Sequence, residues 1–159
     1  MNRQFDRIRS TRSIHLIDIE NLCGKPLVTI PLVCFVWGMY LELIDVGPED
    51  HVVVASSHVN LLAAAEAIPG TRLLVRSGPD GADIELAKVI VYEQIHERFG
   101  HVYLGSGDGG LAPFAHHLAL RGMRVTSVSR MRSTSIRMRM AASDSIYIDG
   151  ARNSLRRTA

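Results

Sequence analysis

Short apolar runs alternate with longer helical stretches along most of the chain. Six runs rich in β-branched residues or leucine predict strands, because turn-forming or polar residues bound them. These strands are expected at residues 14–19, 52–55, 72–75, 102–104, 124–128 and 145–148. Helices are expected at residues 27–46, from a cap at 56–57 to about 67, at 82–99 and at 111–121. Gly100 and Gly122 are expected to end the last two helices.

This alternation predicts an α/β fold, a doubly wound and mainly parallel sheet of five to six strands with helices on both faces. The strands are almost continuously apolar, which is typical of a sheet that is covered on both sides. Right-handed crossovers then determine most of the topology. Ligands of such sheets bind at the carboxyl ends of the strands, so polar residues at those ends are the first candidates for a functional site.

The longest uncharged run, from Pro26 to Leu41, has the composition of a membrane span. It is shorter than the roughly 20 residues that a bilayer requires, and it contains two prolines. We therefore interpret it as a buried helix in which Pro31 falls early, where proline is tolerated. Trp37 and Tyr40 could belong to the core or to a homodimer interface.

Charge is unevenly distributed, although the net charge is only +2. Residues 1–12 carry four arginines and one aspartate, and residues 121–159 carry nine arginines and two aspartates. The chain therefore divides into a basic arm (1–12), a central domain (13–149) and a basic tail (150–159). Arginine provides sixteen of the eighteen cations, which suits phosphate binding, although a GC-rich genome would also favour arginine.

No signal peptide is visible, because Asp18 and Glu20 interrupt the apolar run that follows the basic N-terminal segment. Cys23 and Cys34 lack the spacing of metal ligands, and we expect free thiols in a reducing compartment. These features predict a cytoplasmic protein that does not associate with membranes.

Two aspartates follow predicted strands. Asp18 stands near the end of the first strand, where an isolated buried carboxylate would be costly. Asp108 follows the fourth strand in the loop Gly105–Gly110, whose glycines permit a tight turn. Capping of the helix near Leu111 is the simpler interpretation of Asp108. The loop lacks the lysine of a P-loop and the full dinucleotide fingerprint, so it is weak evidence for nucleotide binding.

Two further aspartates lie near the boundaries of predicted elements. Asp83 stands at the start of a helix, where it could compensate the helix dipole. It also borders the apolar face of that helix, whereas a capping residue would more naturally project into solvent. Asp144 precedes the last short strand and is unremarkable by itself.

Five segments, taken in their order and spacing, resemble the NYN branch of the PIN-like nuclease superfamily. The resemblance covers roughly residues 13–149, and the ordered set is more specific than any single segment. The matching segments are Leu16–Leu22, Ala82–Ala87, Gly105–Leu111, Gly122–Val125 and Ala142–Asp144.

The resemblance implies a ribonuclease-like site that uses Mg²⁺ or Mn²⁺. By their positions, Asp18, Asp83 and Asp108 correspond to the metal-binding and catalytic acids of the family. Asp144 corresponds to a fourth catalytic acid.

Supporting residues follow from the same resemblance. Asn21 matches the polar residue that supports the first aspartate, and Ser106 matches a small hydroxyl beside the third. Many relatives carry another aspartate two residues after the third, where this chain has Gly110. The site is therefore expected to hold one metal firmly rather than two, with Glu20 or Asp144 as possible compensation.

Carboxylates suit hard divalent cations, which would offset their mutual repulsion and activate water. Arg130, Arg132, Arg137 and Arg139 are expected to hold an RNA backbone without sequence preference. Stacking aromatic residues are scarce, which argues against base-specific readout. The sequence thus predicts a metal-dependent endoribonuclease. The alternatives are an inactive RNA- or protein-binding module and a small-molecule phosphohydrolase or nucleotide-binding protein.

Overall fold

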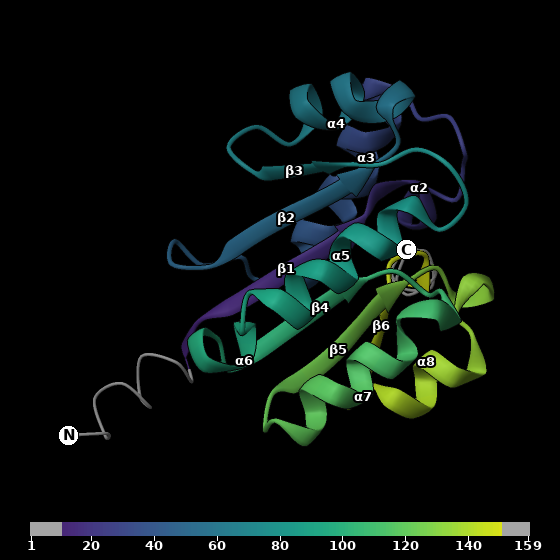
Figure 1. Cartoon of the computed structure of the whole chain (residues 1–159). Coiled ribbons are helices and arrows are strands. Elements are labelled where there is room, and N and C mark those ends of the chain that lie inside the picture. Colours follow the sequence, from purple (N-terminus) through teal and green to yellow (C-terminus); the bar gives the residue numbers. More distant parts are fainter. Residues whose placement is uncertain (1–10, 151–159) are drawn as a thin grey trace, which may run out of the picture.

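The computed structural model describes residues 11–150 (Figure 1). Within this range six strands form one parallel sheet in the order β3-β2-β1-β4-β5-β6, which confirms the doubly wound α/β prediction. The basic arm and the basic tail lie almost entirely outside the described residues. The strands are β1 (Ser13–Asp18), β2 (His51–Ser56), β3 (Arg72–Val75), β4 (His101–Gly105), β5 (Arg124–Ser129) and β6 (Asp144–Tyr147).

Helices cover both faces of the sheet, each over its own apolar core. On one face lie α5 (Gly81–Tyr92), α6 (Ile95–Arg98), α7 (Ala112–Leu120) and α8 (Ile136–Ala141). On the other lie α2 (Ile19–Cys23), α3 (Ile30–Leu43) and α4 (Leu61–Ala67). Short 3-10 turns occupy His58–Asn60, Gly109–Leu111 and Met131–Ser133.

The central strands are buried on both sides, which explains their almost continuous apolar sequence. In β1, Leu16 belongs to the core under α5 and α7, whereas its neighbour Ile17 belongs to the core under α3. Both side chains are fully buried, because successive residues of a strand point to opposite faces. The carboxyl end of β1 is therefore held firmly between two packed layers.

The uncharged segment forms helix α3, which is shorter than the expected range 27–46. The hydroxyl of Thr29 accepts a hydrogen bond from the N–H of Leu32 and caps the helix. Only one face of α3 is buried, since Phe35 is 44% exposed and Leu41 is 47% exposed. Among residues 11–150, no helix combines the length and apolarity that a membrane crossing requires.

Three other local predictions were wrong. The helix expected at 82–99 breaks after Tyr92, where Gln94 adopts a left-handed conformation with φ of 47° before the short α6. Gly100 does not cap that helix, because its N–H donates to the carbonyl of Arg12 instead. Ser57 makes no capping hydrogen bond, and its N–H and hydroxyl donate to Glu20.

The arginine-rich segment after β5, for which no helix was expected, contains α8. Ser135 caps this helix by accepting from the N–H of Met138, and Met138 is buried in the core. The N–H of Ser135 also donates to the carbonyl of Gly107 at 2.9 Å. The segment therefore packs directly against the loop that follows β4.

Candidate metal centre

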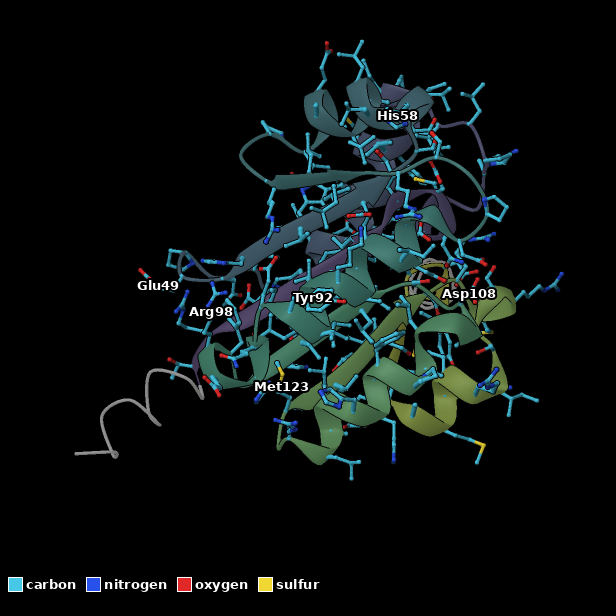
Figure 2. The ribbon with its side chains drawn as sticks, viewed as in Figure 1. Glu49, His58, Tyr92, Arg98, Asp108 and Met123 are labelled. Atoms are coloured by element: carbon cyan, nitrogen blue, oxygen red, sulfur yellow. The ribbon has the colours of Figure 1, made fainter. Side chains whose placement is uncertain are left out.

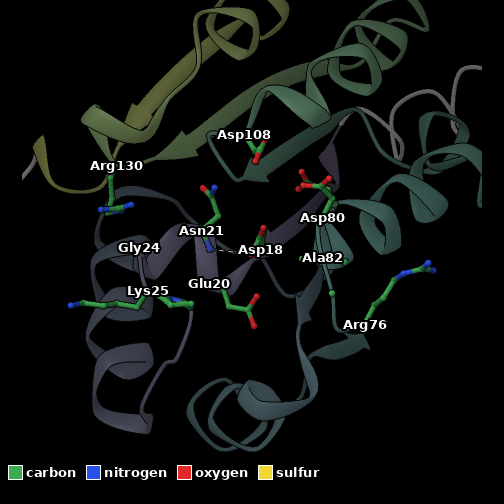
Figure 3. Close-up of a pocket in the computed structure, with 14 residues that line it drawn as sticks. Asp18, Glu20, Asn21, Gly24, Lys25, Arg76, Asp80, Ala82, Asp108 and Arg130 are labelled. Atoms are coloured by element: carbon green, nitrogen blue, oxygen red, sulfur yellow. Dashed lines mark hydrogen bonds between the residues drawn. The ribbon is translucent and has the colours of Figure 1, made fainter.

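The candidate site lies where the strand order reverses, at the carboxyl ends of β1 and β4 (Figure 3). Asp18 is the last residue of β1, and Asp108 lies in the loop after β4. Both line a pocket of about 420 Å³. The connections from these two strands lead away in opposite directions, so a crevice opens between their ends.

Asp18 forms the floor of this pocket and is only 9% exposed. One carboxylate oxygen, Oδ1, accepts a hydrogen bond from the N–H of Asn21 and caps α2. Burial raises the pKa of Asp18 to about 6, although that hydrogen bond lowers it. The negative charges of Glu20 and Asp108 add to the rise. Asp18 therefore has a structural role and also contributes charge to the site.

Asp108 is exposed and lies at the start of the turn that leads into α7. Its Oδ1 accepts from the N–H of Gly110 at 2.8 Å, which confirms the simpler capping interpretation for one oxygen. Ser106 Oγ accepts from the N–H of Asp108 at 3.2 Å and holds the turn from inside. The second carboxylate oxygen of Asp108 remains available to face the pocket.

Asp83 stands in the first turn of α5, three residues after the N-cap Asp80, whose side chain makes no capping hydrogen bond. Its Oδ1 is buried and has no hydrogen-bond partner among the described residues. The pKa of Asp83 is raised to about 7, mainly by burial and in addition by the negative charges of Asp108, Asp18 and Asp80. A buried acceptor without a donor is costly, so this carboxyl group has the environment of a ligand for a cation.

Asp80 is a site residue that the sequence reasoning missed. One ligand oxygen from each of Asp80, Asp83 and Asp108 lies within 4.8 Å of the others. Asp80 adopts a left-handed conformation with φ of 56° immediately before α5, and this turn brings its side chain beside Asp83. The Asp80–Gly81 pair was a turn signal, but it did not indicate a ligand.

The expected triad therefore differs from the observed one. Asp83 and Asp108 come together as expected, and Asp80 is the third member. Asp18 is not part of this set, although it is close enough to raise the pKa of Asp83. It lies deeper, because β1 ends inside the sheet and its side chain turns to cap α2.

The two residues expected to support the acids occupy structural positions around them. Asn21 Oδ1 accepts from the N–H of Gly107 at 3.0 Å and ties the end of β1 to the loop after β4. Glu20 Oε1 accepts from the N–H of Ser57 at 2.8 Å and from Asn60 Nδ2 at 2.6 Å. Glu20 thus holds the loop after β2 and does not join the acidic cluster.

Gly110 lies at the centre of the cluster. A Cβ atom added there would lie 3.1 Å from Asp83 Oδ2 and 3.4 Å from Asp108 Oδ1. A side chain at this position would therefore point between the two carboxylates. The absence of an acid at 110 removes one potential ligand, and Asp80 supplies the third carboxylate in its place.

Cationic side chains line the same pocket. Arg130, an expected nucleic-acid contact, lies across the pocket from Asp80 in Figure 3. Lys25 and Arg76, which were not expected from the sequence, also line the pocket, Lys25 on the side of Arg130 and Arg76 on the side of Asp80. The guanidinium of Arg130 packs over Gly24, where any side chain would collide with it. Gly24 also has a φ of 71°, a left-handed backbone conformation that favours glycine.

The other three expected arginine contacts, Arg132, Arg137 and Arg139, are exposed on the segment after β5. They do not line the pocket. Arg137 lies beside the loop after β4, since its Cδ is 3.8 Å from the position of a Cβ added at Gly109.

Asp144 does not belong to the site, and its prediction as a fourth catalytic acid was wrong. It is the first residue of β6, and it pairs in register with Thr126 in β5. The register through Thr126 and Tyr103 places Asp144 level with His15, three residues before Asp18 at the carboxyl end of β1. The carboxylate of Asp144 forms an ion pair with Arg124 at 2.8 Å. It therefore cannot compensate for Gly110.

The donor set fits a hard divalent cation. Within residues 11–150, no ion pair involves Asp18, Asp80, Asp83 or Asp108. Octahedral ligands about 2.1 Å from Mg²⁺ lie roughly 3 to 4 Å apart, so oxygens within 4.8 Å need to move only slightly to share one ion. A bound cation would also satisfy the buried oxygen of Asp83.

No protein-family model and no curated protein matches this chain. A solved structure of a protein of unknown function, VPA0982 from Vibrio parahaemolyticus, resembles it with a TM-score of 0.59 and 17% sequence identity. The alignment covers 89% of this chain and 94% of that one. At this identity the likeness concerns the fold alone, so membership of the NYN family stays a prediction from the sequence motifs.

Proposed function

We propose that the protein is a metal-dependent ribonuclease that hydrolyses phosphodiester bonds in the pocket at the ends of β1 and β4. The observation that carries the proposal is the convergence of Asp80, Asp83 and Asp108 without a cationic partner. Carboxylates that lie so close repel one another, which raises the pKa of at least one of them. Mg²⁺ or Mn²⁺ would offset this repulsion.

In this proposal Asp80, Asp83 and Asp108 hold the ion, and Asp18 adds negative charge beneath it. When bound, the cation would supply positive charge to the scissile phosphate and activate water for attack. The protein contributes a rigid frame, since Asn21 joins the two loops on which Asp18 and Asp108 lie. Such preorganisation keeps the acids in place before substrate binds.

Arg130, Lys25 and Arg76 are suited to hold the phosphates on either side of the cleavage point. They line the pocket that contains the acids, so a nucleic-acid backbone could contact cations and cluster together. Contacts of this kind carry no sequence information and weaken as the salt concentration rises. The substrate class is therefore recognised mainly through its charged backbone.

The test is cleavage of labelled single-stranded RNA in Mn²⁺ by the wild-type protein and by Asp108→Asn. The asparagine can still accept from the N–H of Gly110, so the variant removes charge without removing the cap. We expect the rate to fall at least about 100-fold, the upper range for disturbing partners of metal ligands. Glu66→Gln, which changes an exposed acid on α4, is the matched control. Equal cleavage by wild type and Asp108→Asn would refute the proposal.

An RNA-binding module without catalytic activity is the second candidate, and Gly110 favours it. The cluster lacks a carboxylate at position 110, where a Cβ atom would lie close to both Asp83 and Asp108. Calorimetric titration with Mn²⁺ discriminates the two. A nuclease should bind Mn²⁺ in a manner that Asp83→Asn abolishes, whereas a binding module should bind RNA with or without the metal.

A further inference from the structure

A second cavity adjoins the acidic cluster. It has a volume of about 690 Å³ and lies between α5 and α7. Asp83, Asp108 and Gly110 form its inner end, so it opens directly onto the candidate metal centre. We refer to this cavity as the α5–α7 groove.

The walls of the groove are apolar and aromatic. Ile84, Ala87 and Val91 form a stripe at helical spacing along α5, and Phe114 of α7 faces it. Tyr92 stands at the outer end and is 77% exposed (Figure 2).

This stripe is separate from the core side of α5. Leu86, Val89 and Ile90 are the residues by which α5 packs on the sheet. Ile84 is 36% exposed and Val91 is 50% exposed, so the helix carries a second apolar face that the fold does not bury. Contiguous exposed apolar surface beside a polar site is typical of a ligand-binding groove.

The charges of the two cavities differ in a way that indicates which part of a ligand each accepts. Lys25, Arg76 and Arg130 line the pocket at the acids. Among residues 11–150, Lys88 is the one cation that lines the groove. It pairs with Glu85 at 2.8 Å, and Arg76 contacts the same carboxylate from the other pocket at 3.5 Å. The groove is therefore suited to a flat, uncharged group attached to a chain whose phosphates lie in the neighbouring pocket.

We propose that the α5–α7 groove binds the nucleobase of a nucleotide next to the scissile phosphate, with Tyr92 as its stacking platform. The inference rests on the proposed function, because a nucleobase is expected in the groove only if the adjoining acidic cluster acts on a nucleic acid. A base stacked and paired inside a duplex cannot enter it. The substrate must therefore be single-stranded, or opened, at the point of cleavage.

The groove contributes affinity without reading sequence. Every base has a flat face that can stack on an aromatic ring. Among residues 11–150, the polar groups that line the groove are the cluster acids, Lys88 and the hydroxyl of Tyr92. This agrees with the expectation that base-specific readout is absent.

The test compares the binding of two labelled strands of equal length by fluorescence anisotropy in Ca²⁺, so that binding is measured apart from cleavage in Mn²⁺. One strand is a single-stranded oligouridylate, and the other carries the same backbone without bases. We expect Tyr92→Ala to raise the Kd for the oligouridylate about 5- to 150-fold, the range of one base–aromatic stack. The same variant should leave the Kd for the abasic strand within about twofold.

Two further variants complete the comparison. Tyr92→Phe keeps the ring and should bind like the wild type. Leu120→Ala removes another exposed apolar side chain, 73% exposed on α7 outside the groove, and should change neither Kd. Because Tyr92 projects into solvent, its replacement should not unfold the protein.

The outcomes separate the inference from the proposed function. Unchanged oligouridylate binding by Tyr92→Ala, or equal binding of both strands by the wild type, would overturn the groove assignment while RNA cleavage in Mn²⁺ still stood. Failure of the wild-type protein to bind either strand would overturn both proposals.

Discussion

Replacement of Asp83 by asparagine should stabilise the metal-free protein at neutral and alkaline pH. The pKa of Asp83 is raised to about 7 from 3.8, chiefly by burial and then by the neighbouring acids. Below pH 4 the group is protonated in both the folded and the unfolded chain and costs nothing. Between pH 4 and 7 the unfolded carboxyl ionises while the folded one keeps its proton, so stability falls, and above pH 7 the cost is constant.

The size of this effect follows from the difference in pKa. A pKa difference of one corresponds to about 1.4 kcal/mol, which gives about 4 kcal/mol for an unscreened group. Asp83 is half-buried and partly screened by water, so we expect about half of that, ~2 kcal/mol. In a domain of this size, such a change corresponds to roughly 4 to 8 °C in Tm.

The assay is urea unfolding of wild type and Asp83→Asn in EDTA, at pH 4 and at pH 8. The variant should exceed the wild type in free energy of unfolding at pH 8 and should lose most of that advantage at pH 4. Saturating Mn²⁺ should reverse the order at pH 8, because only the wild type gains the full binding energy. An equal difference at both pH values would refute the reasoning, and Glu66→Gln should show no comparable pH dependence.

Three other perturbations test separate parts of the site. Gly110→Asp places a carboxylate beside Asp83. It should tighten Mn²⁺ binding about 10-fold by calorimetry and lower the stability of the metal-free protein. Weaker Mn²⁺ binding by a folded variant would contradict the position assigned to residue 110 between the acids. Asn21→Ala leaves the N–H of Gly107 without its acceptor and should cost about 1 to 3 kcal/mol in urea unfolding, whereas an unchanged midpoint would show that this contact does not hold the loops together. Asp144→Asn should leave the Mn²⁺ affinity unchanged. A marked loss of affinity would show that Asp144 takes part in metal binding.

The position of the site in the fold could be predicted from the sequence, because the site lies at the carboxyl ends of strands that the apolar runs mark. Asp18 and Asp108 were placed at one sheet edge by the apolar runs before them, and the parallel sheet brings them together. Asp144 was misplaced for a related reason. It was expected just before a strand. In a parallel sheet the first residue of a strand lies near the amino-terminal end of the sheet, whereas ligands bind at the carboxyl ends.

Asp80 and the helix after β5 could not be predicted in the same way. Asp80 joins the cluster through a left-handed backbone conformation, and a turn signal does not specify where the side chain points. Helix α8 is only six residues long, its apolar residues alternate with arginines, and it depends on the burial of Met138 against the core. The break at Gln94 likewise lacks glycine or proline, so tertiary packing decides it.

The central claim is that Asp80, Asp83 and Asp108 hold one divalent cation, and anomalous diffraction from a crystal soaked in Mn²⁺ tests it most directly. The account predicts one strong anomalous peak among these three carboxylates, within about 2.2 Å of their oxygens. It also predicts that the peak disappears in Asp83→Asn. Well-ordered carboxylates with no peak between them, or a peak that forms only elsewhere on the protein, would contradict the account.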